Sequence, residues 1–190
     1  MKKEQILYRG IVCDSNEERY FLMWAVELHK YGYISSIDRA TSYTLADKVA
    51  VPLQKPTKTG FKQLSQHLLH DKVYTPDFDV IFTEKGMKLF VDIIGDGNKL
   101  TKPLLTTSDM GNNVIIEVKP KFNQNGKTDV FAICQKWLYQ KHGIIANKVI
   151  PQDLFAETFT PTDYLLTDKS GKPRKLGKVI TINEFLNKVK

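Results

Sequence analysis

The sequence predicts an α/β fold in which a mixed central β-sheet is flanked by helices. Two stretches have strand character: apolar and acidic residues alternate from 77 to 82, and an apolar β-branched run from 114 to 116 is followed by Pro120. Two other stretches, 15–31 and 128–142, carry apolar residues at helical spacing and are followed by glycine. We therefore expect two helices packed on one sheet.

The length of 190 residues is enough for one well-buried core and short for two, so a single domain is expected. Its core should span about residues 5–150, and residues 151–190 should form a basic C-terminal extension packed on it. The chain has 28 Lys and Arg against 21 Asp and Glu, a net charge of +7. This excess of positive charge favours a polyanionic partner.

The sequence also bears on location and on cysteine chemistry. No apolar run approaches the roughly 18 residues of a membrane span, and the charged first residues lack the apolar segment of a signal peptide. We therefore expect a cytoplasmic protein with no membrane partner. Cys13 and Cys134 lie outside any Cys-x-x-Cys or Cys/His pattern, which favours buried free thiols over a disulfide or a zinc site.

The first elements along the chain are a short strand within residues 5–13, broken at Gly10, and the first helix. Glu18 fits two roles at the start of this helix. It stands three residues after Ser15, as in a capping box in which the glutamate bonds back to the Ser15 amide. It also shares a helical face with apolar residues, so its carboxylate points to the core, where a charge needs a partner or a metal. Glu17 is the competing carboxylate.

The next segment should contain one or two strands within 33–53, followed by a surface loop or insertion at 55–66 that holds proline, glycine and lysines. His67, His70 and Asp71 have the spacing of metal ligands on a helix. No matching ligand motif stands near them, so a solvated loop edge is the preferred interpretation.

Asp77 opens a strand on which the aromatic and aliphatic residues face one side and Asp77 the other. A turn at 83–86 should lead into a second strand, 87–94, so that the two strands form a hairpin. The following stretch, 95–112, has turn residues at both ends and is expected to be a loop.

The apolar β-branched strand carries a second acidic position. Side chains alternate across a strand, so Glu117 and Lys119 share one face and Val118 points into the opposite layer. One interpretation is an ion pair between Glu117 and Lys119 at the strand end. The other is a cation site: if the hairpin that starts at Asp77 lies beside this strand, two carboxylates and a lysine come together, and such oxygen ligands suit Mg²⁺.

The second helix, 128–142, should pack through one apolar face, and a strand near 147–150 should close the core. The residues of this face are Val130, Phe131, Ile133, Cys134, Trp137 and Leu138. A Ser-Gly turn within 168–178 is surrounded by basic residues and is either a solvated hairpin tip or a surface that contacts phosphates. The basic residues are Lys169, Lys172, Arg174, Lys175 and Lys178. A short helix, 183–190, ends the chain.

Pro76-Asp77 followed by Glu117-Val118-Lys119 resembles the signature of the PD-(D/E)xK nuclease superfamily, which includes many restriction enzymes and junction resolvases. The separation of 40 residues between Asp77 and Glu117 is long for this motif, so residues 95–112 would be an inserted loop. The layout is most similar to that of small phage endonucleases and transposon end-cutting nucleases.

Two further motifs support the resemblance. The Ser-x-x-Glu motif that ends at Glu18 is similar to one that superfamily members carry at the start of the first helix, where the acid faces the active site. Gln135 and Tyr139 match the Gln-x-x-x-Tyr of RecB-type nucleases, and Lys136 matches a lysine that other members place on this helix.

The resemblance implies a restriction-endonuclease-like fold and hydrolysis of DNA phosphodiesters with Mg²⁺ or Mn²⁺. In that case Asp77, Glu117 and the Val118 carbonyl hold the metal, and Lys119 orients or helps to deprotonate the attacking water. Glu18 would hold a second ion or an ordered water. The further positions are Gln135 as a catalytic residue and Lys121 and Lys136 as DNA contacts beside the basic turn.

An endonuclease of phage or mobile-element DNA metabolism is therefore the preferred function, whereas the Gln135 motif favours an exonuclease. The first alternative is a non-catalytic protein that kept the nuclease fold, either a DNA-binding protein or a phage structural or assembly protein. The second is a nuclease that acts on RNA. The partners expected beside DNA are a second copy of the chain or a phage protein, and a phage-encoded chain would act in the host cytoplasm.

Overall fold

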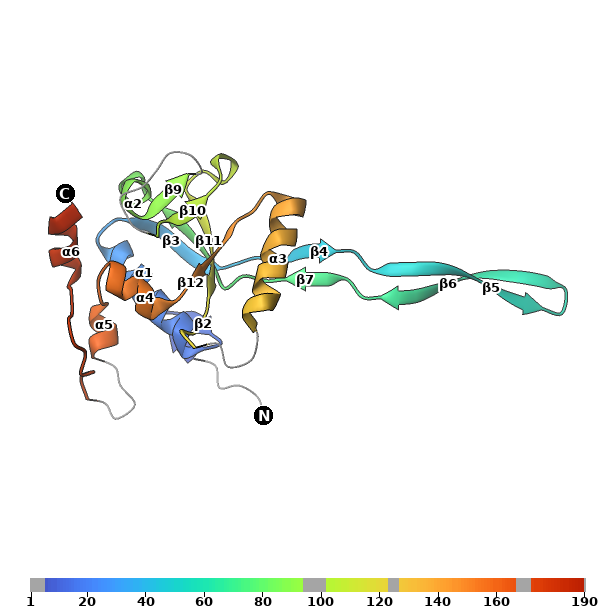
Figure 1. Cartoon of the computed structure of the whole chain (residues 1–190), viewed down its shortest axis with the longest axis horizontal. Helices are drawn as coiled ribbons and strands as arrows, with labels where there is room; N and C mark the ends of the chain where they lie inside the picture. Colours follow the sequence, from blue (N-terminus) through green and yellow to red (C-terminus); the bar gives the residue numbers. More distant parts are fainter. Residues whose placement is uncertain (1–5, 94–101, 123–126, 167–171, 190) are drawn as a thin grey trace.

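The centre of the protein is a four-stranded mixed sheet, seen in a computed structural model that describes residues 6–93, 102–122, 127–166 and 172–189 (Figure 1). The strand order is β12-β11-β8-β3. The strands are β3 (Ile34–Arg39), β8 (Phe78–Phe82), β11 (Asn113–Val118) and β12 (Ala146–Val149). β8 runs antiparallel to both β3 and β11, whereas β11 and β12 are parallel. The predicted α/β fold with a mixed sheet is confirmed at this level.

Helices cover both faces of the sheet. α1 (Asn16–Lys30) packs on the face that carries Phe78, Val80 and Ile116, within one large apolar cluster. α3 (Lys127–His142) covers the other face, where Ile115 joins a smaller cluster. Side-chain alternation along β8 and β11 therefore separates the two packing layers as the sequence predicts.

The N-terminal elements also agree with the sequence. β1 (Ile6–Tyr8) and β2 (Ile11–Cys13) form a small antiparallel hairpin. α1 then begins after Ser15, whose side chain accepts a hydrogen bond from the Glu18 amide, and it ends before Gly32, which has a φ of +74°. Glycine adopts this conformation without the steric cost that other residues meet.

A long two-stranded arm extends from the domain (Figure 1). At its base β4 (Tyr43–Ala46) pairs with β7 (Lys72–Tyr74), and beyond them β5 (Val49–Thr57) pairs with β6 (Gly60–Leu69). The loop predicted at 55–66 is therefore wrong, although its surface position is correct. Each strand of a two-stranded ribbon is an edge strand, and edge strands tolerate the prolines that otherwise argue against a sheet.

The hairpin predicted after β8 is also wrong. Residues 84–90 form a helix, α2 (Glu84–Phe90), because Thr83 caps it by accepting the Gly86 amide. Gly86 lies so close to the Tyr33 carbonyl that an added Cβ would be 2.0 Å from its oxygen.

Only β9 (Val91–Ile93) remains of the predicted second strand, and it pairs in parallel with β10 (Leu104–Thr106). A short 3-10 helix, η1 (Ser108–Met110), follows β10. The predicted loop at 95–112 thus contains regular structure, and its first part lies outside the described residues.

Fewer apolar residues of α3 are buried than its sequence suggests. Cys134 and Leu138 are buried against the sheet, whereas Val130, Ile133 and Trp137 are exposed. These three residues form a second apolar stripe of the helix, and they line a hollow of about 410 Å³ at the base of the arm. Helical periodicity predicts the helix, but it cannot show that the sheet buries only the stripe with Cys134 and Leu138 and leaves the second stripe exposed.

The C-terminal residues add three helices: α4 (Pro151–Glu157), α5 (Thr162–Leu165) and α6 (Ile182–Val189). α4 and α5 pack beside α1, and the Trp24 indole N–H of α1 donates to Thr158 Oγ1, just after α4, at 3.0 Å. α6 packs through Phe185 against Phe90 and Phe159. Cys13 and Cys134 are buried free thiols. Among the described residues, no helix is long and apolar enough to cross a membrane.

Candidate active site

The register of β8 and β11 brings Asp77 and Glu117 to the same end of the sheet. Ile116 pairs with Phe78, so Asp77, one residue before β8, lies beside the end of β11. The Asp77 amide donates to the Ile116 carbonyl at 2.9 Å, and Asp77 Oδ2 accepts the Val118 amide at 2.6 Å. The predicted proximity of the two carboxylates thus follows from antiparallel pairing, although β8 and β9 are not the hairpin that was expected to produce it.

Glu117 is only 7% exposed, and its carboxylate has two partners. One oxygen forms an ion pair with the Lys119 ammonium, and the other accepts a hydrogen bond from the Tyr74 hydroxyl at 2.8 Å. The Lys119 amide donates to the Val149 carbonyl at 2.8 Å, which holds this residue beside β12. Burial, together with the Glu117 carboxylate, raises the pKa of Tyr74 well above its ordinary value, so the phenol remains a hydrogen-bond donor.

Asp77 has a raised pKa. Burial raises its pKa from the ordinary 3.8 to about 7, and repulsion from Glu117 adds to this effect. The Val118 amide and Lys119 act in the opposite direction, and Glu18 contributes further repulsion. A bound cation offsets the repulsion between two neighbouring carboxylates.

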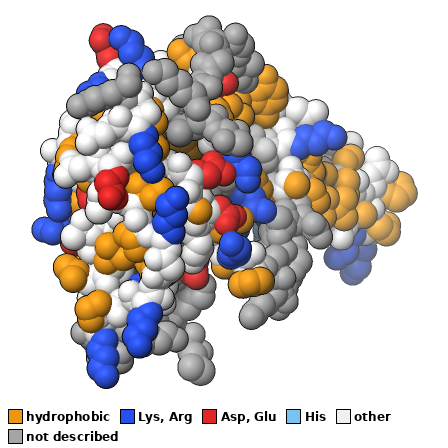
Figure 2. All heavy atoms as spheres, turned by 60° about the vertical axis from the view of Figure 1, so that its left-hand side comes forward, with side chains coloured by type: hydrophobic (Ala, Val, Ile, Leu, Met, Phe, Trp, Pro, Cys, Tyr) orange, Lys and Arg blue, Asp and Glu red, His pale blue; other side chains and the backbone are white. Residues whose placement is uncertain are grey.

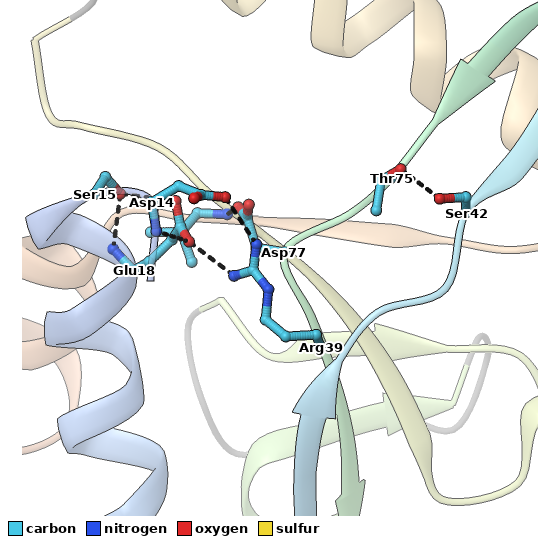
Figure 3. Close-up of polar contacts among 8 residues, drawn as sticks. Asp14, Ser15, Glu18, Arg39, Ser42, Thr75 and Asp77 are labelled. Atoms are coloured by element: carbon cyan, nitrogen blue, oxygen red, sulfur yellow. Dashed lines mark hydrogen bonds and ion pairs between the residues drawn. The ribbon is translucent and has the colours of Figure 1, made fainter. Parts of the chain in front are cut away.

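Glu18 lies at the N-terminus of α1 and faces this end of the sheet (Figure 3). It is 6% exposed, whereas Glu17 is partly exposed, so Glu18 is the inward-facing carboxylate. It accepts hydrogen bonds from the Ser15 hydroxyl and the Asp14 amide, both at 2.9 Å. The capping interaction is therefore present, but it reaches the Asp14 amide instead of the predicted Ser15 amide.

Arg39 provides the counter-charge for Glu18 (Figure 3). Its guanidinium lies 2.8 Å from Glu18 Oε2 and 3.2 Å from Asp14 Oδ2, and it covers the ring of Phe78. It also lies within electrostatic reach of Asp77. Sequence reasoning missed Arg39 and Tyr74 because each comes from a strand whose register the sequence does not fix.

Replacing Glu18 with Gln should lower both stability and activity. Gln keeps one acceptor oxygen but leaves Arg39 without its buried counter-charge, so the free energy of unfolding should fall by about 1 kcal/mol. The loss is no larger because the Arg39 side chain is 36% exposed and solvent screens its charge. In a chain of this size that corresponds to a fall in Tm of about 2–4 °C. The resemblance to nucleases further implies that DNA cleavage falls at least about tenfold when it is measured below the melting temperatures of both proteins.

Glu17→Gln is the matched control, since it changes an acid in the same helical turn and should alter stability by less than about 0.5 kcal/mol. A Glu18→Gln variant with unchanged Tm and unchanged cleavage would leave Glu18 without a role in the site.

The amide of Gln135 contacts the backbone that leads into β12. Its Oε1 accepts the Ala146 amide at 2.7 Å, and its Nε2 donates to the Ile144 carbonyl at 3.4 Å. Gln135 therefore has a positioning role at the start of β12 in this structure. Lys136 and Tyr139 are exposed on α3.

The basic residues expected to contact DNA have different environments. Lys121 forms an ion pair with Asp153 at 3.1 Å. Arg174 donates to the Tyr20 hydroxyl at 2.9 Å and lies over the rings of Tyr20 and Tyr164, so it packs the C-terminal extension against α1. Lys169 lies outside the described residues. Lys172, Lys175 and Lys178 are exposed, as are Lys121 and Lys136.

The residues at the end of β8 and β11 offer oxygen ligands of the kind that Mg²⁺ and Mn²⁺ prefer: the buried Glu117 carboxylate, the partly buried Asp77 carboxylate and the backbone carbonyl of Val118. The raised pKa of Asp77 indicates that burial first, and repulsion from Glu117 second, disfavour the charged form of this acid. Within the described parts of the chain, no three His, Cys, Asp or Glu side chains are grouped as metal ligands. The rings of His67, in β6, and His70, just after β6, lie next to each other at an exposed part of the arm near its base.

Comparisons of the chain with protein-family models, curated proteins and solved structures give no match, so function has to be inferred from these side chains.

Proposed function

We propose that this protein is a metal-dependent deoxyribonuclease of the PD-(D/E)xK type, with the restriction-endonuclease-like version of its α/β fold. One observation carries the proposal: antiparallel β8 and β11 bring the partly buried Asp77 and the buried Glu117 together, with Lys119 against Glu117. The three residue types are those of the superfamily motif, and the strand pattern of the sequence predicts the sheet positions of Asp77 and Glu117.

In this proposal Asp77, Glu117 and the Val118 carbonyl bind one divalent cation. When bound, the ion supplies a Lewis acid that polarises the scissile phosphate and lowers the pKa of water. Asp77 must lose its proton before it can act as a ligand, so cation binding should become tighter as the pH rises through about 7. Tyr74 orients the Glu117 carboxylate by hydrogen bonding to one of its oxygens.

Lys119 then has the role of a cation beside the reacting phosphate. Its ammonium can release Glu117 to a metal ion and donate to a phosphate oxygen or to the attacking water. Arg39 supplies a second positive charge at the same end of the sheet, and its Glu18 partner can bind an ordered water there. An endonuclease of phage or mobile-element DNA metabolism is the specific form of the proposal.

The competing proposal is a non-catalytic protein of the same fold that binds DNA or takes part in phage assembly. It is favoured by the ion pairs themselves, because Lys119 already neutralises Glu117 and Arg39 already neutralises Glu18. A nuclease differs from such a protein because it cuts DNA into shorter products when Mg²⁺ is present.

The test is a cleavage assay on plasmid, linear, branched and single-stranded DNA and on RNA, with Mg²⁺, with Mn²⁺ and with a chelator. We expect metal-dependent cleavage of at least one DNA and none in the chelator. Cutting of the plasmid would indicate an endonuclease, and cutting of linear ends alone an exonuclease. Cleavage of RNA alone, or binding of DNA with no cleavage under any condition, would contradict the proposal.

A further inference from the structure

The arm formed by β5 and β6 has no place in the proposed catalytic site. Every residue of both strands is exposed, and the strands are held together by nine cross-strand pairs. At about 3.3 Å per residue, nine residues of β5 extend about 30 Å, which is close to one helical turn of duplex DNA. An isolated two-stranded hairpin is marginally stable in water, so an arm of this length is expected to dock on a partner.

The charges of the arm point to the nature of that partner. Residues 49–69 contain Lys55, Lys58 and Lys62 and no acidic residue. Lys55 and Lys62 are directly opposite each other on one face, a like-charge pair that destabilises a ribbon unless an anion lies nearby. Figure 2 shows basic and hydrophobic side chains along the visible part of the arm.

The tip also carries an apolar pair next to these lysines. Pro56 and Phe61 are cross-strand partners beside the turn, and Phe61 is 75% exposed. Side chains alternate across the ribbon, so this pair lies on the face opposite Lys55 and Lys62. Proteins that bend DNA insert such apolar wedges between base steps while basic groups hold the neighbouring phosphates.

We propose that the arm is a DNA-binding ribbon whose tip enters a groove of the duplex. Lys55, Lys58 and Lys62 contact phosphates, and Phe61 inserts between base steps. A two-stranded ribbon fits the major groove, and apolar wedges also enter from the minor groove. The choice of DNA as the polyanion rests on the proposed function. The base of the arm is tied to the candidate active site, because Tyr74 of β7 donates its hydroxyl to Glu117.

The first test measures affinity for a fluorescent duplex of several helical turns by anisotropy, over a range of salt and with a chelator present so that no DNA is cut. The arm variant is Lys55→Gln/Lys58→Gln/Lys62→Gln. The control is Lys30→Gln/Lys88→Gln/Lys188→Gln, which removes the same charge from exposed positions on α1, α2 and α6. All six positions are exposed, so both variants should fold.

We expect the arm variant to bind at least about tenfold more weakly. The slope of log affinity against log salt should also fall, by up to about 0.9 for each phosphate that the variant no longer neutralises. The control should show much smaller changes in both quantities. Equal affinity and slope in the two variants would overturn the proposal, as would a wild-type protein that does not bind DNA.

The second test follows DNA bending by energy transfer between dyes at the two ends of the duplex. Phe61→Ala should reduce the bend while the salt slope stays unchanged, because the lysines still bind the phosphates. A Phe61→Ala complex with an unchanged bend would overturn the wedge role. If sedimentation shows that arm substitutions break up a dimer while DNA affinity is unchanged, the arm binds a second copy of the chain and the proposal is wrong.

These outcomes are separate from those of the cleavage assay. A protein that binds DNA through the arm but cuts nothing would refute the nuclease and leave the arm proposal standing. A protein that cuts DNA but binds it equally well without the arm lysines would refute the arm proposal and leave the nuclease standing.

Discussion

Replacing Glu117 with Gln is expected to lower DNA cleavage by about a thousandfold or more while the protein stays folded. Gln has nearly the same shape and can still accept the hydrogen bond from Tyr74. It cannot bind a divalent cation as a carboxylate does or balance the charge of Lys119. The loss is large because the metal and the groups around it supply most of the stabilisation of the developing charge.

The measurement is the rate of plasmid cleavage in Mg²⁺ under single-turnover conditions, with melting curves of the same preparations. Glu84→Gln is a matched control, since Glu84 is an exposed acid in the first turn of α2. It should cut at the wild-type rate. A folded Glu117→Gln protein that cuts as fast as this control would exclude Glu117 from the chemistry.

Replacing Asp77 with Asn is expected to remove cleavage and to stabilise the protein near neutral pH. The pKa of Asp77 is about 7 in the folded protein, against an ordinary 3.8. Between about pH 4 and pH 7 the folded protein therefore retains a proton that the unfolded chain releases, so the wild-type free energy of unfolding falls as the pH rises. Asn does not titrate, and it can still accept the Val118 amide. Above pH 7 the gain should be on the order of 2–4 kcal/mol.

The test compares Tm values of wild type and Asp77→Asn from pH 5 to pH 8 in a chelator. The Asn variant should be the more stable at pH 8, and the difference should shrink toward pH 5. Added Mg²⁺ should raise the wild-type Tm at pH 8 and leave the variant nearly unchanged, because a ligand stabilises only the state that binds it. A difference in Tm that does not vary with pH would show that the pKa of Asp77 is not raised in the folded protein.

The sequence predicts the parts of this fold that depend on periodicity. The α1 and α3 helices and the central strands β8 and β11 follow from patterns of 3.6 and 2 residues, and capping residues mark the ends of α1. The arm is missed because Pro56, Gly60 and the lysines near them are typical of loops. In an exposed two-stranded ribbon both strands are edge strands, so proline costs little stability. Because neither face of the ribbon is buried, its sequence does not show the alternation of apolar and polar residues that marks a strand.

The stretch after β8 shows a different limit. Residues 87–93 are mostly apolar, with Lys88 and Asp92 between the apolar residues, and this pattern fits either a strand or a helix. Residues 84–90 form a helix because Thr83 caps it and Gly86 permits close contact with the Tyr33 backbone. The second of these depends on a tertiary neighbour that the sequence does not reveal.

The sequence predicts those residues of the candidate site that lie on or directly beside the two central strands. Asp77, Glu117 and Lys119 come together because β8 and β11 are neighbours. Arg39 and Tyr74 belong to strands β3 and β7, whose registers depend on the whole fold, so a lone Arg and a lone Tyr gave no signal. Charge counts have the same weakness: they cannot distinguish an Arg that stacks on tyrosines from one that is free for phosphates.

The central claim is that Asp77 and Glu117 act together in metal-dependent cleavage of DNA. It is tested most directly by comparing the wild type with the double variant Asp77→Asn/Glu117→Gln in one plasmid cleavage assay with Mg²⁺. We predict that the wild type cuts, that a chelator stops it, and that the folded double variant with Mg²⁺ gives no more product than the wild type in chelator. Cleavage by the double variant at the wild-type rate, or no cleavage by the wild type on any DNA, would contradict the claim.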